Sequence, residues 1–173
     1  MMESERFVNA LEGLREVRKY SFQLLILWEH SIIVADTAEY KIIAKYKPED
    51  VTTNPVLISQ AAQNPEYSTH IETAIKHAKA EYSHPFADLD KNEKKNFILL
   101  IYERLAVSFG VEILKIIPGW VSTQLDPRMA YDKEGMLASA RRMAKLYEEN
   151  GWSRERFMIK VPSTWEGIQC AKE

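Results

Sequence analysis

The chain has 173 residues, of which 46% are hydrophobic and 28% charged, with 23 basic against 25 acidic side chains and a formal net charge of -2. These proportions are typical of a globular protein with a buried core, and they exclude a disordered chain. The nearly balanced charge also argues against a protein that binds nucleic acid through a basic surface. By length alone we expect one domain.

Cysteine usage and hydropathy indicate the compartment. The single cysteine, Cys170, cannot form an internal disulfide, so nothing points to an oxidising environment. The most apolar stretch, residues 22–35, is interrupted by Glu29 and His30 and falls short of the ~20 residues of a membrane-spanning helix. The first six residues lack the basic region of a secretory signal. We therefore expect a cytoplasmic protein that contacts no membrane.

Helices and strands are predicted to alternate from the N-terminus onward. A short helix is expected over about Glu5–Val17, where apolar residues recur at helical spacing. The continuous apolar run Ser31–Thr37 predicts a strand buried on both faces. A short helix over Ala38–Tyr46 and a second strand over Val51–Asn54 follow, and Pro55 suits the first turn of the next helix.

The middle of the chain is expected to be helical scaffold. Helices should occupy about Val56–Ile116 and be broken at Pro65 and Pro85. One of them carries an apolar stripe that includes Phe97, and Glu103 faces away from most of it.

Two more strands are predicted toward the C-terminus. Residues 120–126 form the third, and Asp132 is expected to cap a helix that runs through Glu149. Phe157–Pro162 forms the fourth strand, and Ser163 is expected to cap a helix that reaches the end of the sequence.

Four strands alternating with helices imply parallel β/α units, in which functional side chains gather at the carboxyl ends of the strands. The polar residues expected there are Asp36, Asn54, Gln124, Asp126, Lys160, Ser163 and Thr164.

Lys160 is the most informative of these residues, because it lies among apolar residues in the fourth strand. An ammonium group in such a place must be paired, neutral or directed into a cavity. Loss of surrounding water favours the neutral amine, which can attack a carbonyl carbon and form a Schiff base. The alternative is a lysine that extends out of the strand end or pairs with a neighbouring carboxylate.

The other strand-end residues also admit two interpretations. Asp36 is either a general base or the N-cap of the helix that begins near Ala38. Asn54 is either an ordinary turn residue or an amide that binds a substrate hydroxyl. Asp126, before Pro127, is expected in a turn.

Several other kinds of site are not predicted. The four histidines do not have the spacing of zinc ligands, and we expect a solvated helix face for them and no metal site. Cys170 has no basic or histidine neighbour that would activate its thiol. No glycine-rich phosphate loop occurs, which argues against nucleotide binding.

Four segments of the chain resemble transaldolase, specifically the longer cytosolic subfamily of this pentose phosphate pathway enzyme. They are Val34–Thr37, Tyr46–Pro55, Ile116–Thr123 and Ile159–Gln169, of which the second and the fourth are the most specific. The similarity covers nearly all of the chain from about Ser31 onward, in the family's order and spacing. An unrelated lysine-dependent aldolase would share the imine chemistry but lack the run that ends at Pro55.

The resemblance implies a (β/α)₈ barrel that transfers a dihydroxyacetone unit from sedoheptulose 7-phosphate to glyceraldehyde 3-phosphate, giving erythrose 4-phosphate and fructose 6-phosphate. It implies no metal and no organic cofactor. By motif, Lys160 matches the Schiff-base lysine and Asp36 the aspartate that takes the proton of the C4 hydroxyl. Asn54 matches the asparagine that binds the dihydroxyacetone unit.

The sequence departs from the family at three places. Gln124 stands where the family has a glutamate that works through a water in forming and hydrolysing the imine, and an amide cannot shuttle that proton. Trp120 replaces an arginine, and residues 18–30 have no counterpart.

The family's later strands would follow Glu173, so the resemblance implies only the first four β/α units of the barrel. We therefore expect residues 1–30 to hold an N-terminal helix and an unmatched segment, and residues 31–173 to form the N-terminal half of a transaldolase-type barrel. Such a half leaves two strand edges open and should be poorly stable as a monomer. One interpretation is a transaldolase fragment; the other is an inactive pseudoenzyme whose open edges form a homo-oligomer or bind a full-length subunit.

Overall fold

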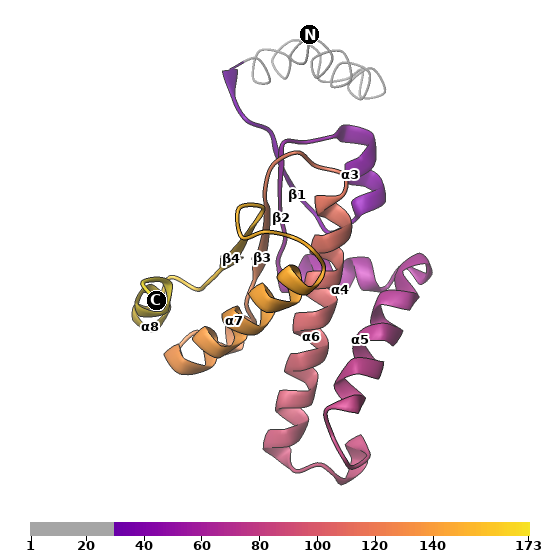
Figure 1. The fold of residues 1–173 in the computed structure, drawn as a ribbon, viewed down its shortest axis with the longest axis vertical. Helices are drawn as coiled ribbons and strands as arrows, with labels where there is room; N and C mark the ends of the chain where they lie inside the picture. The colour runs from indigo at the N-terminus through magenta and orange to yellow at the C-terminus, as the bar shows by residue number, and fades with distance from the viewer. Residues whose placement is uncertain (1–29) are drawn as a thin grey trace.

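The computed structural model describes residues 30–173, in which four parallel strands form one sheet in the order β1-β2-β3-β4 (Figure 1). The strands are β1 (Val34–Asp36), β2 (Asp50–Thr52), β3 (Val121–Gln124) and β4 (Phe157–Lys160). Parallel neighbours in chain order confirm the predicted α/β fold, the first four units of a (β/α)₈-type barrel. The predicted helix over Glu5–Val17 lies outside the described residues.

Six helices connect and follow these strands in the described part of the chain. They are α3 (Tyr40–Tyr46), α4 (Pro55–Ala62), α5 (Ser68–Ala80), α6 (Lys91–Leu114), α7 (Lys133–Glu149) and α8 (Trp165–Ala171). Short 3₁₀ turns lie at Pro65–Tyr67, Phe86–Asp88 and Pro127–Met129. The breaks predicted at Pro65 and Pro85 are confirmed. Between residues 30 and 173, no helix combines the length and the apolar character needed to cross a membrane.

Local sequence explains where the helices begin and end. Asp90 and Glu93 form a reciprocal capping box at the start of α6, which satisfies backbone N–H groups that have no partner within the helix. Asp132 caps α7 as predicted, by accepting a hydrogen bond from the backbone of Gly135. The cap of α8 is Thr164, so the prediction of Ser163 was wrong by one residue.

The core lies between the sheet and α6 and α7. Val51 and Val121 are fully buried on the covered face of the sheet, and Phe157 stacks on Tyr147 of α7 with ring centroids 4.4 Å apart. A Cβ atom at Gly110 of α6 would lie 1.8 Å from the hydroxyl oxygen of Tyr147. The glycine therefore allows α6 and α7 to approach each other closely.

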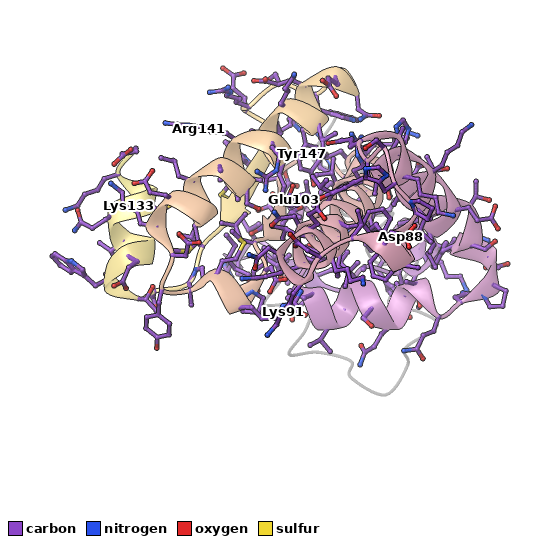
Figure 2. All side chains as sticks on the ribbon, turned by 90° about the horizontal axis from the view of Figure 1, so that it is seen from below. Asp88, Lys91, Glu103, Lys133, Arg141 and Tyr147 are labelled. Carbon is purple, nitrogen blue, oxygen red and sulfur yellow. The ribbon has the colours of Figure 1, made fainter. Side chains whose placement is uncertain are left out.

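The prediction that Glu103 faces away from the packed side of α6 was wrong, because Glu103 is 1% exposed and lies at helical spacing from the buried Ala106 and Val107. Its side chain is buried between α6 and α7, where the hydroxyl of Ser139 donates to it over 2.5 Å and the guanidinium of Arg142 over 2.7 Å. Figure 2 shows Glu103 and Tyr147 inside the molecule. A carboxylate tolerates this position because both oxygens have strong donors.

The prediction that the first strand is buried on both faces was wrong. β1 is shorter than the predicted Ser31–Thr37, and Val34 is 47% exposed. The reason is that β1 lies at the edge of the sheet and the described helices cover only one of its faces.

Candidate functional site

The face of the sheet away from α6 and α7, called the open face below, collects the predicted site residues. Asp36 is in register with Thr52, and Gln124 is in register with Lys160. Because every second residue of a strand points to the same side, these four side chains share the open face near the carboxyl ends of the strands. Asn54 follows Thr52 by two residues in extended backbone and lies at the same end.

Thr52 orients the carboxylate of Asp36. The Thr52 hydroxyl donates a hydrogen bond to Oδ1 of Asp36 over 2.8 Å, and the Asp36 side chain is otherwise exposed. The interpretation of Asp36 as a helix cap was wrong, because Glu39 occupies the cap position of α3. The carboxylate is therefore held at the end of β1 with one oxygen still accessible to a ligand.

Asn54 has a structural role that leaves its amide nitrogen available. Its Oδ1 accepts hydrogen bonds of 3.0 Å from the backbone N–H groups of Val56 and Leu57, so the side chain caps α4. Pro55 occupies the first turn of α4, as predicted. Because the cap uses only the oxygen, the two Nδ2 hydrogens can be donated to another group.

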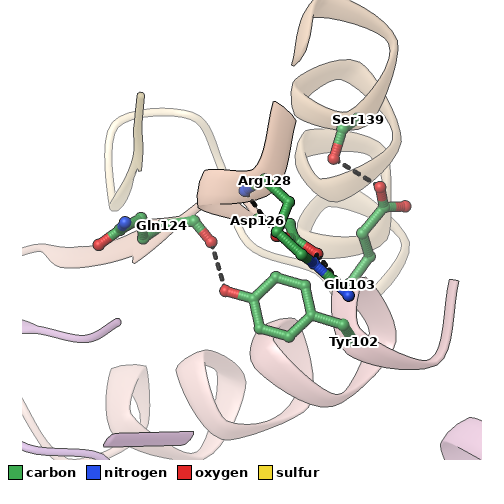
Figure 3. Close-up of polar contacts among 6 residues, drawn as sticks. All are labelled: Tyr102, Glu103, Gln124, Asp126, Arg128 and Ser139. Carbon is green, nitrogen blue, oxygen red and sulfur yellow. Dashed lines mark hydrogen bonds and ion pairs between the residues drawn. The ribbon is translucent and has the colours of Figure 1, made fainter. Parts of the chain in front are cut away.

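Gln124 is anchored through its backbone. The hydroxyl of Tyr102 on α6 donates to the carbonyl oxygen of Gln124 over 2.6 Å, while the Gln124 side chain points away from α6 (Figure 3). Burial raises the pKa of Tyr102, so its hydroxyl keeps the proton that it donates. Sequence reasoning missed Tyr102, because nothing in the spacing of α6 connects it with β3.

Lys160 is half-buried at the end of β4, beside Gln124. Within residues 30–173, none of the ion pairs includes Lys160, so the predicted alternative of pairing with a neighbouring carboxylate finds no support there.

The loop after β3 is fixed by an ion pair. Asp126 is 7% exposed and caps the 3₁₀ turn that follows, which confirms the predicted turn. Both of its carboxylate oxygens accept hydrogen bonds from the guanidinium of Arg128 (Figure 3). Burial acts to raise the pKa of Asp126, but the hydrogen bonds from Arg128 outweigh it and hold the pKa below its ordinary value. The hydroxyl of Thr164 also donates to the backbone oxygen of Ala130, which joins this loop to the end of β4.

Other reactive side chains lie away from the open face. No group of three or more metal-binding side chains occurs in the described part of the chain. The prediction that the histidines lie on a solvated helix face was wrong for His70, whose ring packs against those of Tyr40 and Phe109. Cys170 is buried, and burial raises the pKa of its thiol.

A family model described as transaldolase/fructose-6-phosphate aldolase matches residues 33–173. The chain belongs to this family. It is similar to the transaldolase of Homo sapiens, with 46% identity over 147 residues, which cover 85% of this chain and 41% of that protein. The transaldolase of Shewanella woodyi is 48% identical over 141 residues, which cover 82% of this chain and 42% of that protein. That of Aliivibrio salmonicida is 45% identical over 150 residues, covering 87% and 45% respectively.

This transaldolase-family chain spans less than half the length of these relatives. The matched part includes all four strands of the sheet and every residue of the open face named above.

Proposed function

We propose that this chain is a transaldolase, which uses Lys160 to transfer a dihydroxyacetone unit between sugar phosphates in the cytoplasmic, non-oxidative pentose phosphate pathway. The observation that supports this most strongly is the placement of Asp36, Asn54, Gln124 and Lys160 at one end of the open face. Family membership supports the same assignment. The donors would be sedoheptulose 7-phosphate or fructose 6-phosphate, and the acceptors glyceraldehyde 3-phosphate or erythrose 4-phosphate.

In the first step, the neutral amine of Lys160 attacks the carbonyl carbon of the ketose, and loss of water gives an imine. The protonated imine withdraws electrons from the bond between C3 and C4. The half-buried position of Lys160, without an acidic partner among residues 30–173, supports this role.

In the second step, Asp36 accepts the proton of the C4 hydroxyl as the bond between C3 and C4 breaks and the aldose leaves. The bond from Thr52 occupies one carboxylate oxygen and leaves the other to act as the base. The amide nitrogen of Asn54 would donate a hydrogen bond to a hydroxyl of the retained three-carbon unit.

In the last steps, the retained carbanion attacks the aldehyde of the acceptor, Asp36 returns its proton to the alkoxide that forms, and hydrolysis of the imine frees Lys160. Imine formation and hydrolysis both move protons through water. Gln124 lies beside Lys160 and can orient such a water, but its amide cannot take up or release the proton. We therefore expect slow turnover.

A transfer assay tests the proposal. Fructose 6-phosphate and erythrose 4-phosphate are mixed with the 173-residue chain, and the appearance of sedoheptulose 7-phosphate is followed. We expect a measurable rate that is lost in Lys160→Arg and in Asp36→Asn. A rate that is the same in Lys160→Arg as in the parent chain would refute the role of Lys160.

A second candidate function is a non-catalytic interaction module, and the amide at Gln124 favours it. The Gln124→Glu variant separates the two candidates, because a carboxylate restores a group that can carry the proton. Turnover that rises in this variant supports the enzyme. If the variant folds but shows no turnover, the interaction module becomes the better assignment.

A further inference from the structure

One peptide group at the end of β3 is bonded both to a helix and to β4. Its carbonyl oxygen, which belongs to Gln124, accepts a hydrogen bond of 2.6 Å from the hydroxyl of Tyr102 on α6. Its N–H, which belongs to Leu125, donates a hydrogen bond of 3.0 Å to the carbonyl oxygen of Lys160. The two bonds therefore join Tyr102 to the backbone of Lys160 through a single amide.

The two hydrogen bonds of this peptide group strengthen each other. A carbonyl oxygen that accepts a hydrogen bond polarises its amide, which makes the N–H on the other side a better donor. The effect is larger where water is excluded, and here Leu125 is fully buried and Tyr102 is half-buried. The bond from Tyr102 therefore tightens the contact between Leu125 and Lys160.

Tyr102 acts on the backbone and not on the reacting groups. Its hydroxyl bonds to the main chain of Gln124, while the Gln124 side chain points away from it (Figure 3). Burial raises the pKa of Tyr102, and the negative charges of Asp126 and Glu103 act in the same direction. The phenol therefore remains a hydrogen-bond donor at neutral pH and does not exchange protons with a substrate.

We propose that Tyr102 is a positioning residue for Lys160, whose amine it holds in place through the peptide group between Gln124 and Leu125. Gln124 and Lys160 are the last residues of their strands, and strand ends are where local opening is easiest. A misplacement of about 1 Å at a reacting group can cost about 100-fold in rate. The role of the amine rests on the proposed function, whereas the link between Tyr102 and the Lys160 backbone does not.

Hydrogen exchange tests the link itself. Tyr102→Phe removes the hydroxyl and keeps the ring, and the Leu125 amide should then exchange about tenfold faster in an NMR measurement. The control amide is that of Val121, which donates to the carbonyl oxygen of Arg156 over 3.1 Å at the other end of the same strand pair. Its exchange should not change.

The matched control variant is Tyr82→Phe. The hydroxyl of Tyr82 also donates to a backbone oxygen, that of Glu93, over 3.4 Å, but Tyr82 lies in the turn after α5 and contacts neither β3 nor β4. Exchange of the Leu125 amide in this variant should equal that of the parent chain.

A second measurement separates positioning from a general loss of structure. Formaldehyde forms an imine with the Lys160 amine without being oriented, whereas fructose 6-phosphate must be held with its carbonyl carbon at the amine. In both cases the amine adds to the carbonyl carbon, water leaves, and hydride from cyanoborohydride reduces the imine to a stable amine that mass spectrometry detects. Tyr102→Phe should slow the modification of Lys160 by fructose 6-phosphate about tenfold and leave that by formaldehyde unchanged.

Faster exchange confined to Leu125, together with slower trapping confined to fructose 6-phosphate, would support the proposal. Unchanged exchange at Leu125 in Tyr102→Phe, or an equal increase at Leu125 and Val121, would overturn it. An equal fall in both trapping rates would overturn it as well. If the parent chain forms no adduct with fructose 6-phosphate, the proposed function fails, and exchange at Leu125 still decides whether Tyr102 holds the backbone of Lys160.

Discussion

The two faces of the sheet both carry polar side chains, but only the open face leaves some of them without a hydrogen bond to another described residue. On the covered face, Thr53 donates to the backbone oxygen of Ser122 over 3.0 Å, and Thr123 shares a hydrogen bond of 2.6 Å with Tyr147. On the open face, the side chains of Gln124 and Lys160 have no hydrogen bond to another residue between 30 and 173.

The polar groups of the covered face stabilise the fold, whereas those of the open face remain available to a ligand. A buried polar group is costly unless it is hydrogen-bonded, and in the described part of the chain every buried side-chain nitrogen and oxygen has a partner. The hydrogen bonds of those buried groups are made within the protein, so the groups cannot bind a ligand. The groups of the open face keep donors and acceptors that a ligand can use, which is why substitutions on the two faces should have different consequences.

The largest effect is expected from Phe109→Ala behind the covered face. Phe109 is fully buried, and its ring centroid lies 5.3 Å from that of Tyr67 and 5.2 Å from that of His70. Removal of a buried phenyl ring should lower the free energy of unfolding by about 4 kcal/mol. Ile98→Ala on the same helix, at a position that is 46% exposed, is the control and should cost about 0.5 kcal/mol. Equal losses in urea denaturation would contradict the assignment of the core.

On the open face, Gln124→Glu should change rate without changing stability. A carboxylate beside Lys160 can move protons to and from the water of imine formation, which is worth about 100-fold in the transfer rate. The free energy of unfolding, measured in urea, should remain within about 0.5 kcal/mol of that of the parent. An unchanged transfer rate together with a lower free energy of unfolding would mean that residue 124 stabilises the fold and takes no part in catalysis.

Glu103→Gln tests the buried carboxylate behind the covered face. The substitution keeps the shape of the side chain but replaces one acceptor oxygen with a donor, which leaves Ser139 or Arg142 without its partner. We expect a loss of about 2 kcal/mol in unfolding free energy. The matched control is Glu112→Gln, whose partner Lys115 is exposed, with an expected loss of about 0.5 kcal/mol.

Arg128→Met should have the smallest effect, and it should depend on pH. Because the pKa of folded Asp126 lies below its ordinary value, the pair stabilises the fold above the unfolded pKa, and this contribution is lost as the pH falls through the folded one. The variant should lose about 1 kcal/mol at pH 7, a modest figure because Arg128 is largely exposed. The difference in stability between parent and variant should shrink as the pH falls through the folded pKa of Asp126, and a difference that stays constant in acid would refute the ionic origin.

Much of this comparison could be predicted from sequence because strand alternation and helix caps are local. The α/β class, the cap at Asp132 and the strand-end positions of Asp36 and Lys160 all follow from short patterns. What sequence could not give depends on packing between distant segments. Thr52 orienting Asp36, Tyr102 anchoring Gln124 and the burial of Glu103 each need two elements brought together by the fold.

The most direct test of the account is to trap the imine. The chain is incubated with fructose 6-phosphate, reduced with borohydride and digested, and the modified peptide is identified by mass spectrometry. We predict a three-carbon adduct on Lys160 that is absent from Lys160→Arg and strongly reduced in Asp36→Asn. An adduct distributed over exposed lysines such as Lys45, or no adduct on Lys160, would contradict the assignment of the open face as the site of chemistry.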